Sequence, residues 1–179
     1  DAALARLAQA LATDPDNDTA RGEMVTLLLQ QGQTADARAA YQPMASRAIV
    51  NPRIAALGHW LAAVEAAPKA RSAGELGAAI AQNKRDFDAR FALAQHHFAA
   101  GRFTEAMDEL LEIVMRDKAW NDNLARRTYV AILTVMAKPA PKPAAGDAKS
   151  TLELTGKAAA PAGDPVVDAY RRKLSMALF

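Results

Sequence analysis

The chain has 179 residues, about half of them apolar, so it is long enough to bury a core of its own. Its 22 Lys and Arg residues against 20 Asp and Glu residues leave a formal charge of +2, which argues against nucleic-acid binding, and the absence of cysteine excludes disulfides and thiolate chemistry. No apolar run approaches the roughly 20 residues that a membrane helix requires, so we expect a cytoplasmic protein with no membrane partner.

Alanine is abundant and aromatic residues are few, which predicts an all-α protein, because strands favour β-branched and aromatic side chains. The chain opens on Asp1 rather than Met, so we expect a fragment of a longer protein. The first predicted helix covers residues 2–13 and ends at Asp14 and Pro15.

An internal repeat follows this helix. Residues 18–44 align without gaps on residues 87–113, at an offset of 69 residues. The matched pairs are Ala20 with Ala89, Arg21 with Arg90, Met24 with Leu93, Gly32 with Gly101, Ala37 with Ala106, Tyr41 with Leu110 and Met44 with Ile113. The offset is close to twice the ~34-residue period of tetratricopeptide repeats, so we expect a divergent helix pair between the copies, at about 52–66 and 74–83.

One glycine and one alanine are predicted to shape each repeat. Gly32 and Gly101 lie where the first helix of a copy must stop and turn, a position that often needs the left-handed backbone of glycine. Ala37 and Ala106 lie where the two helices of a copy cross, and a small side chain there lets the backbones approach. The fold class that follows is a tetratricopeptide-like helical-hairpin solenoid.

The second helix of the second copy has two distinct faces. An apolar stripe at helical spacing consists of Phe103, Ala106, Met107, Leu110, Leu111 and Val114. The opposite face carries Glu105, Asp108, Glu109 and Glu112. Because no histidine or second carboxylate helix lies nearby in sequence, we interpret this acidic face as solvated and predict no metal site.

The remaining chain divides into three parts. A helix is predicted after Asn121, as its N-cap, with Asp122 in the first turn, and it ends near Met136, so the repeats occupy residues 1–137. Residues 138–163 are rich in Lys, Pro, Ala and Gly, which predicts a flexible linker. A last helix, residues 164–179, begins at Asp164 and Pro165 and is expected to pack on the solenoid as a C-terminal capping helix.

We predict no catalytic, cofactor-binding or metal site, and therefore no enzyme. His96 and His97 are adjacent on a helix, about 100° apart, and cannot bind one metal as an i, i+4 pair could. His59 beside Trp60 has no partner in sequence, so packing is the default interpretation for it. Phosphate-binding loops, nucleophile elbows and zinc-protease helices are absent from the sequence.

The second copy and the C-terminus resemble a known family. The carrying residues are the run from Asp88 to Ala94, Gly101 to Phe103, Ala106, Leu110, Leu111, Val114, Asp117, Trp120, Asn121, Asp122, Ala125 and Arg126, with the tail from Tyr170 to Leu174 and the final Leu178 and Phe179. In this order they resemble the C-terminal tetratricopeptide region of bacterial co-chaperedoxins of the YbbN or CnoX type. The resemblance makes Trp120 and Asn121 part of the repeat structure, at a Trp-Asn-Asp corner.

This resemblance implies a function. Such proteins join an N-terminal thioredoxin fold to the helical region, hold unfolding client proteins and pass them to chaperonin and Hsp70-type chaperones. The thioredoxin domain is absent from this sequence, so oxidoreductase activity is not carried over, and the native chain is expected to continue N-terminally into that fold. The alternative is an assembly scaffold for a single partner unrelated to protein folding.

The last helix supplies the predicted partner-binding residues. On a helical wheel Val167, Tyr170, Leu174 and Leu178 form one stripe, which suits packing on the preceding helices. The partner-binding set on the other side is Asp168, Arg172, Met176 and Phe179. Apolar anchors beside a charge are typical of a helix that binds in a groove, and the resemblance implies that this helix contacts the chaperonin.

Overall fold

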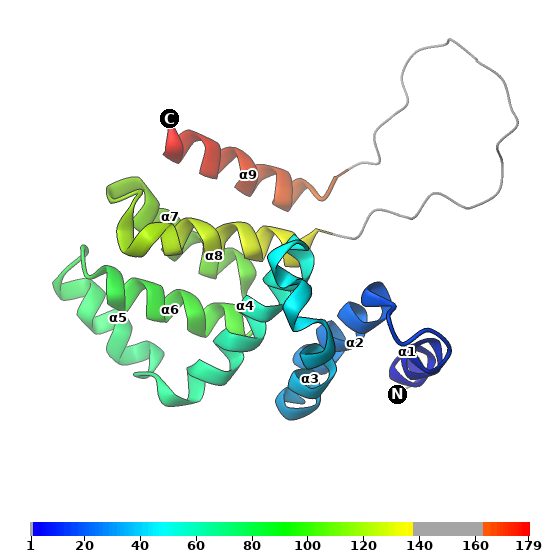
Figure 1. Ribbon diagram of the computed structural model, residues 1–179. Helices are drawn as coiled ribbons and strands as arrows, with labels where there is room; N and C mark the ends of the chain where they lie inside the picture. The colour runs from blue at the N-terminus through cyan, green and yellow to red at the C-terminus, as the bar shows by residue number, and fades with distance from the viewer. Residues whose placement is uncertain (1, 138–162) are drawn as a thin grey trace, which may run out of the picture.

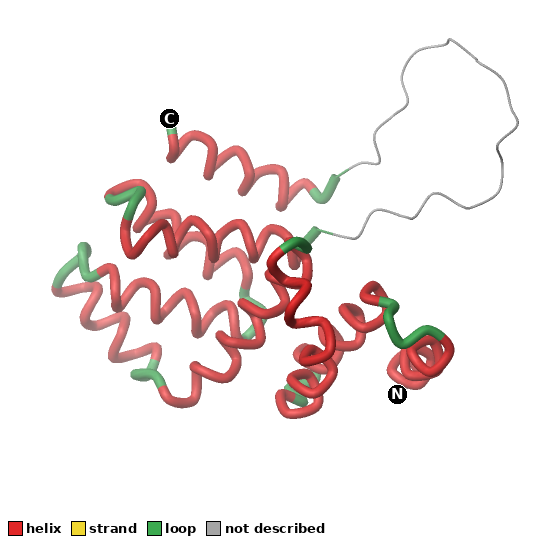
Figure 2. Tube along the Cα trace, viewed as in Figure 1, coloured by secondary structure: helices red, strands yellow, loops and turns green. Residues whose placement is uncertain are grey.

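The computed structural model describes residues 2–137 and 163–179, and these residues form helices joined by short turns, with no strand among them (Figures 1 and 2). The predicted all-α fold is therefore confirmed. The predicted linker lies outside the described residues except for Gly163.

The helices agree closely with the predicted ranges. They are α1 (Ala2–Thr13), α2 (Asp18–Gln30), α3 (Thr34–Tyr41), α4 (Pro52–Ala66), α5 (Ala73–Gln82), α6 (Phe87–Ala99), α7 (Phe103–Arg116), α8 (Trp120–Met136) and α9 (Pro165–Leu178). Two 3₁₀ segments, Gln42–Ile49 and Ala67–Lys69, follow α3 and α4.

The two copies of the repeat are the hairpins α2–α3 and α6–α7, and they begin in the same way. Asn17 caps α2 by accepting a hydrogen bond from the Ala20 N–H, at 3.0 Å, and Asp86 caps α6 through the Ala89 N–H, at 2.9 Å. Asn17 and Asp86 are 69 residues apart, which is the offset between the two copies. Each side chain accepts a hydrogen bond from an N–H group that has no partner within its helix.

The two hairpins also turn in the same way. Gly32 and Gly101 each have φ +72°, in the left-handed region. Each glycine and the residue after it donate backbone hydrogen bonds back into the helix, from Gly32 to Leu29, Gln33 to Leu28, Gly101 to Phe98 and Arg102 to His97, at 2.9–3.1 Å. This double bond pattern is the Schellman motif, which closes a helix C-terminus around a left-handed residue.

The first hairpin departs from the second at Pro43. The alignment places Pro43 opposite Glu112, inside α7, yet α3 ends at Tyr41 and continues as a 3₁₀ segment. Proline has no N–H to donate and its ring crowds the carbonyl four residues earlier, so a regular α-helix cannot pass through it. Met44 and its counterpart Ile113 are nevertheless both fully buried, so the 3₁₀ segment returns the chain to the core.

The middle helix pair exists, as predicted, but its helices separate. α4 packs on α6 and α8, whereas α5 packs on α6 (Figure 1). Trp60 of α4 is buried and its ring contacts Phe98 of α6, with centroids 6.2 Å apart, and Phe103 of α7, at 5.3 Å. α4 therefore belongs to the central bundle with α6, α7 and α8.

The predicted N-cap at Asn121 is wrong. Asn121, Asp122 and Asn123 have φ of 45°, 56° and 61°, so they form a left-handed turn between Trp120 and the right-handed part of α8. An N-cap residue needs an extended backbone, and no side chain caps the start of α8. Asn and Asp are the non-glycine residues that enter this region most readily, which explains why three of them occur together.

α9 packs along α7 and α8 (Figure 1). Val167, Tyr170 and Leu174 are buried in this contact, and Leu178 packs at its edge. The Tyr129 hydroxyl of α8 donates to the Tyr170 carbonyl at 2.8 Å. α9 is thus held to the body by an apolar stripe and a buried hydrogen bond.

The acidic face of α7 is only partly solvated. Asp108 accepts a hydrogen bond from the Tyr170 hydroxyl of α9 at 3.0 Å, and its side chain remains 56% exposed. Glu109 pairs at 2.7 Å with the buried Arg90. The interpretation of the whole face as solvated is corrected at Glu109, which is half-buried beside Arg90 of the preceding helix, whereas Asp108 remains exposed.

Candidate binding surfaces

The outer face of α9 carries the most exposed apolar side chains of that helix. Met176 is 73% exposed and the terminal Phe179 fully exposed. Arg172 is exposed as well, and the spacing of the three residues, i, i+4 and i+7, puts them on one face. The structure therefore brings these predicted partner-binding residues together.

Asp168 lies on the same face but is separated from the others. Its position is eight residues before Met176 along the helix, which is about 12 Å of rise. Its carboxylate is 3.2 Å from the Arg171 guanidinium, in an exposed pair on the first turns of α9. Asp168 is thus outside the compact group formed by Arg172, Met176 and Phe179.

Polar contacts with the body of the protein fix the orientation of α9. Lys118, before α8, donates to the Leu178 carbonyl at 2.7 Å. The Lys173 ammonium lies 4.1 Å from the centroid of the Tyr170 ring and 3.6 Å from Asp108. Burial, with the hydrogen bond to Asp108, raises the pKa of Tyr170 to about 12. The inner face of α9 is therefore engaged along its length, while the outer face is left to solvent.

The predicted repeat residues occupy packing positions or turns. Ala37 and Ala106 are fully buried inside their hairpins. Trp120 is half-buried, with its ring 5.4 Å from that of Phe91 and 6.5 Å from that of Phe87, so it packs the start of α6 against the start of α8. Asn121 is exposed on the left-handed turn that follows.

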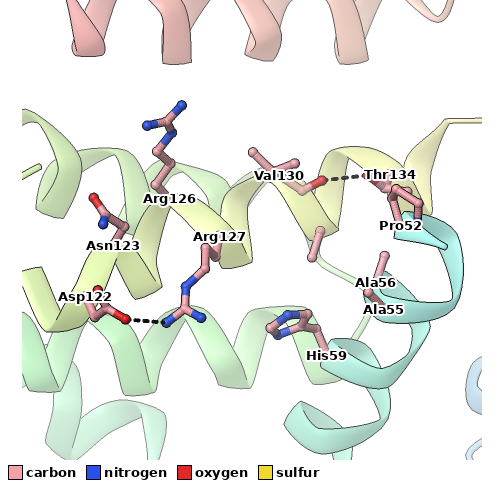
Figure 3. Close-up of a pocket in the computed structure, with 11 residues that line it drawn as sticks. Pro52, Ala55, Ala56, His59, Asp122, Asn123, Arg126, Arg127, Val130 and Thr134 are labelled. Atoms are coloured by element: carbon pink, nitrogen blue, oxygen red, sulfur yellow. Dashed lines mark hydrogen bonds and ion pairs between the residues drawn. The ribbon is translucent and has the colours of Figure 1, made fainter. Parts of the chain in front are cut away.

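A second surface, not predicted from the sequence, is a groove of about 540 Å³ between α4 and α8 (Figure 3). It is lined by Pro52, Ala55, Ala56, His59, Asp122, Asn123, Arg126, Arg127, Val130, Ala131 and Thr134. The two walls are far apart in the chain, and they meet because α8 packs on α4 as well as on α7.

The histidines have separate environments. His59 is half-buried and lines the groove, and burial and the nearby Arg127 charge lower its pKa. His97 accepts a hydrogen bond from the Arg102 side chain at 3.0 Å, and His96 lies 2.7 Å from the Arg71 carbonyl. Within residues 2–137 and 163–179, no three His, Asp or Glu side chains gather as metal ligands would.

Among the residues that the structure describes, no helix combines the length and apolar character that crossing a membrane requires.

Comparison with known proteins identifies the repeats. Two family models described as tetratricopeptide repeat match the chain, one over residues 1–60 and the other over residues 66–149. Together they include both hairpins, α5, α8 and part of α4. No curated protein and no solved structure matches the chain.

Proposed function

We propose that this tetratricopeptide-repeat solenoid is the partner-binding region of a thioredoxin-like co-chaperone that binds chaperonin, Hsp70-type chaperones and unfolding client proteins. Tetratricopeptide repeats indicate a protein-interaction module, and proteins built from them are generally non-catalytic scaffolds. The co-chaperone role, a cytoplasmic location and an N-terminal thioredoxin fold rest on the resemblance of the second repeat and the tail to the co-chaperedoxins.

The observation that carries the proposal is the outer face of α9. A helix held by its inner face presents Met176 and Phe179 to solvent beside Arg172. Large apolar side chains at helical spacing are the anchors with which a helix binds an apolar groove on a partner. We therefore assign the chaperonin contact to this face, with Asp168 at its N-terminal end.

The test is chaperonin binding by a double variant, Met176→Ser with Phe179→Ser. Because both side chains are exposed, helicity and the melting temperature should stay unchanged, while chaperonin affinity, measured by biolayer interferometry, should fall by roughly tenfold or more. The matched control is Leu174→Ser on the buried face, which should lower the melting temperature as well. Unchanged chaperonin affinity in the folded double variant would remove α9 as the partner site.

A pull-down from lysate distinguishes the two classes of protein-binding function. Capture of chaperonin and Hsp70 with many clients below stoichiometric amounts supports the co-chaperone. A single stoichiometric partner unrelated to folding supports the assembly scaffold instead.

A further inference from the structure

The groove between α4 and α8 changes character along its length. Figure 3 shows Arg126, Arg127 and Asp122 toward the start of α8 and Val130 toward its end, where the groove meets Pro52 of α4. One end of the groove is thus charged and the other end is apolar. Both walls are helices that pack on the body of the protein.

The charged end is electropositive. The Asp122 carboxylate lies 3.9 Å from the Arg127 guanidinium, and the Asp122 side chain is 93% exposed, so the pair is weak. Arg126 is exposed and forms no ion pair with any residue of the described ranges. His59 adds a half-buried imidazole on the opposite wall, close enough to Arg127 for that charge to lower its pKa.

The position of the two arginines on α8 strengthens this potential. They follow the left-handed turn after Leu124 and Ala125, and so lie in the first turn of the right-handed part of the helix. The N-terminal end of a helix carries a partial positive charge, and cations there are unfavourable. An anion bound in the groove would relieve the repulsion between this end and the two guanidinium groups.

The apolar end provides room for side chains. Val130 is 45% exposed there, and Ala55 and Ala56 on α4 leave the space that larger side chains would fill. A volume near 540 Å³ lies within the range of roughly 300–1,000 Å³ found for ligand sites, and it suits a few side chains rather than a whole helix.

We propose that this groove binds an acidic peptide segment of a partner protein, with carboxylates at Arg126 and Arg127 and an apolar side chain against Val130. The charge of the lining decides the occupant: guanidinium groups bind carboxylates in paired hydrogen bonds, and no Phe, Tyr or Trp lines the groove to stack a nucleic-acid base. The inference rests on the proposed function only in taking the solenoid as a protein-binding module.

The first test uses three fluorescein-labelled peptides with the same leucines, carrying Glu, Gln or Lys at all other positions. Fluorescence anisotropy with the purified chain should give saturable binding of the Glu peptide, binding weaker by roughly tenfold or more for the Gln peptide, and none for the Lys peptide. Equal affinity for the Glu and Gln peptides, or no binding of the Glu peptide, would overturn the proposal.

The second test locates the binding. Arg126→Glu with Arg127→Glu should abolish binding of the Glu peptide, and the milder Arg126→Gln with Arg127→Gln should weaken it by roughly tenfold. The matched control is Lys84→Glu with Arg85→Glu, which makes the same change in net charge at the exposed turn before α6. If the control weakens binding as much as the groove variants, the attraction is a general charge effect and the groove is not the site.

The two proposals fail separately. The peptide experiment contains no chaperonin, and the variants of α9 leave the groove residues unchanged. If the chain binds chaperonin through Met176 and Phe179 but does not bind acidic peptides, only the proposal for the groove is overturned. Loss of the chaperonin role would leave an acidic-peptide site intact.

Discussion

A single glycine shows how closely the helices approach. Gly58 lies inside α4, where alanine would be favoured by about 1 kcal/mol, but an added Cβ would collide with the Tyr41 hydroxyl. Tyr41 is anchored, since its hydroxyl donates to the Ile54 carbonyl at 3.2 Å. Glycine is therefore required by packing between the first hairpin and α4.

Gly58→Ala should destabilise the protein by about 1 kcal/mol net, because the strain of displacing Tyr41 exceeds the gain in helix propensity. The matched control is Gly77→Ala in α5, where an added Cβ meets no atom within 4 Å, and this change should stabilise by up to about 1 kcal/mol. Chemical denaturation of both variants measures the difference. Stabilisation by Gly58→Ala would show that the approach of Tyr41 imposes no constraint.

At the scale of the element, the hairpin α6–α7 depends on the small residue at its crossing. Ala106 is fully buried, so Ala106→Leu should overpack the helix pair and lower the free energy of unfolding by roughly 1–3 kcal/mol. Ala39→Leu, on the exposed side of α3, should change it by less than about 0.5 kcal/mol. A neutral melting temperature for Ala106→Leu would contradict the assignment of the crossing point.

Sequence reasoning succeeded where local chemistry repeats and failed where distant helices meet. The glycine turns, the helix ranges and the apolar stripe of α9 could be predicted, because each depends on residues close together in the chain. The groove could not, since nothing in the sequence of either wall indicates that α8 packs on α4. Asn121 was assigned as a cap because Asn is common both at N-caps and in left-handed turns, and only the backbone distinguishes them.

At the scale of the whole molecule, the stability that α9 contributes should decrease at alkaline pH. The pKa of Tyr170 is raised from 10.0 to about 12 in the folded protein, first by burial and then by Asp108. Below pH 10 the neutral phenol contributes its full stability, and this contribution is lost as the pH rises from about 10 to 12, because the unfolded chain releases the proton first. Burial raises the pKa of Tyr129 in the same direction.

The melting temperature, followed by circular dichroism, should therefore fall over this interval, and it should fall less steeply in Tyr170→Phe, which has no phenolic proton to release. The same variant should melt lower than the parent at neutral pH, because it loses the bond to Asp108. Identical slopes in the two proteins would show that Tyr170 does not control alkaline unfolding.

The exposure of α1 has a consequence for the order in which the molecule unfolds. None of its residues is buried, and it packs on α2. In a solenoid each unit is stabilised mainly by its neighbours, so separation can begin at a terminal unit without disturbing the rest. Amide hydrogens of α1 should exchange with solvent first, those of α2 and α3 next, and those of α4, α6, α7 and α8 only on global unfolding. Hydrogen exchange followed by mass spectrometry measures this order, and protection of α1 equal to that of α7 would show that the chain opens as one unit.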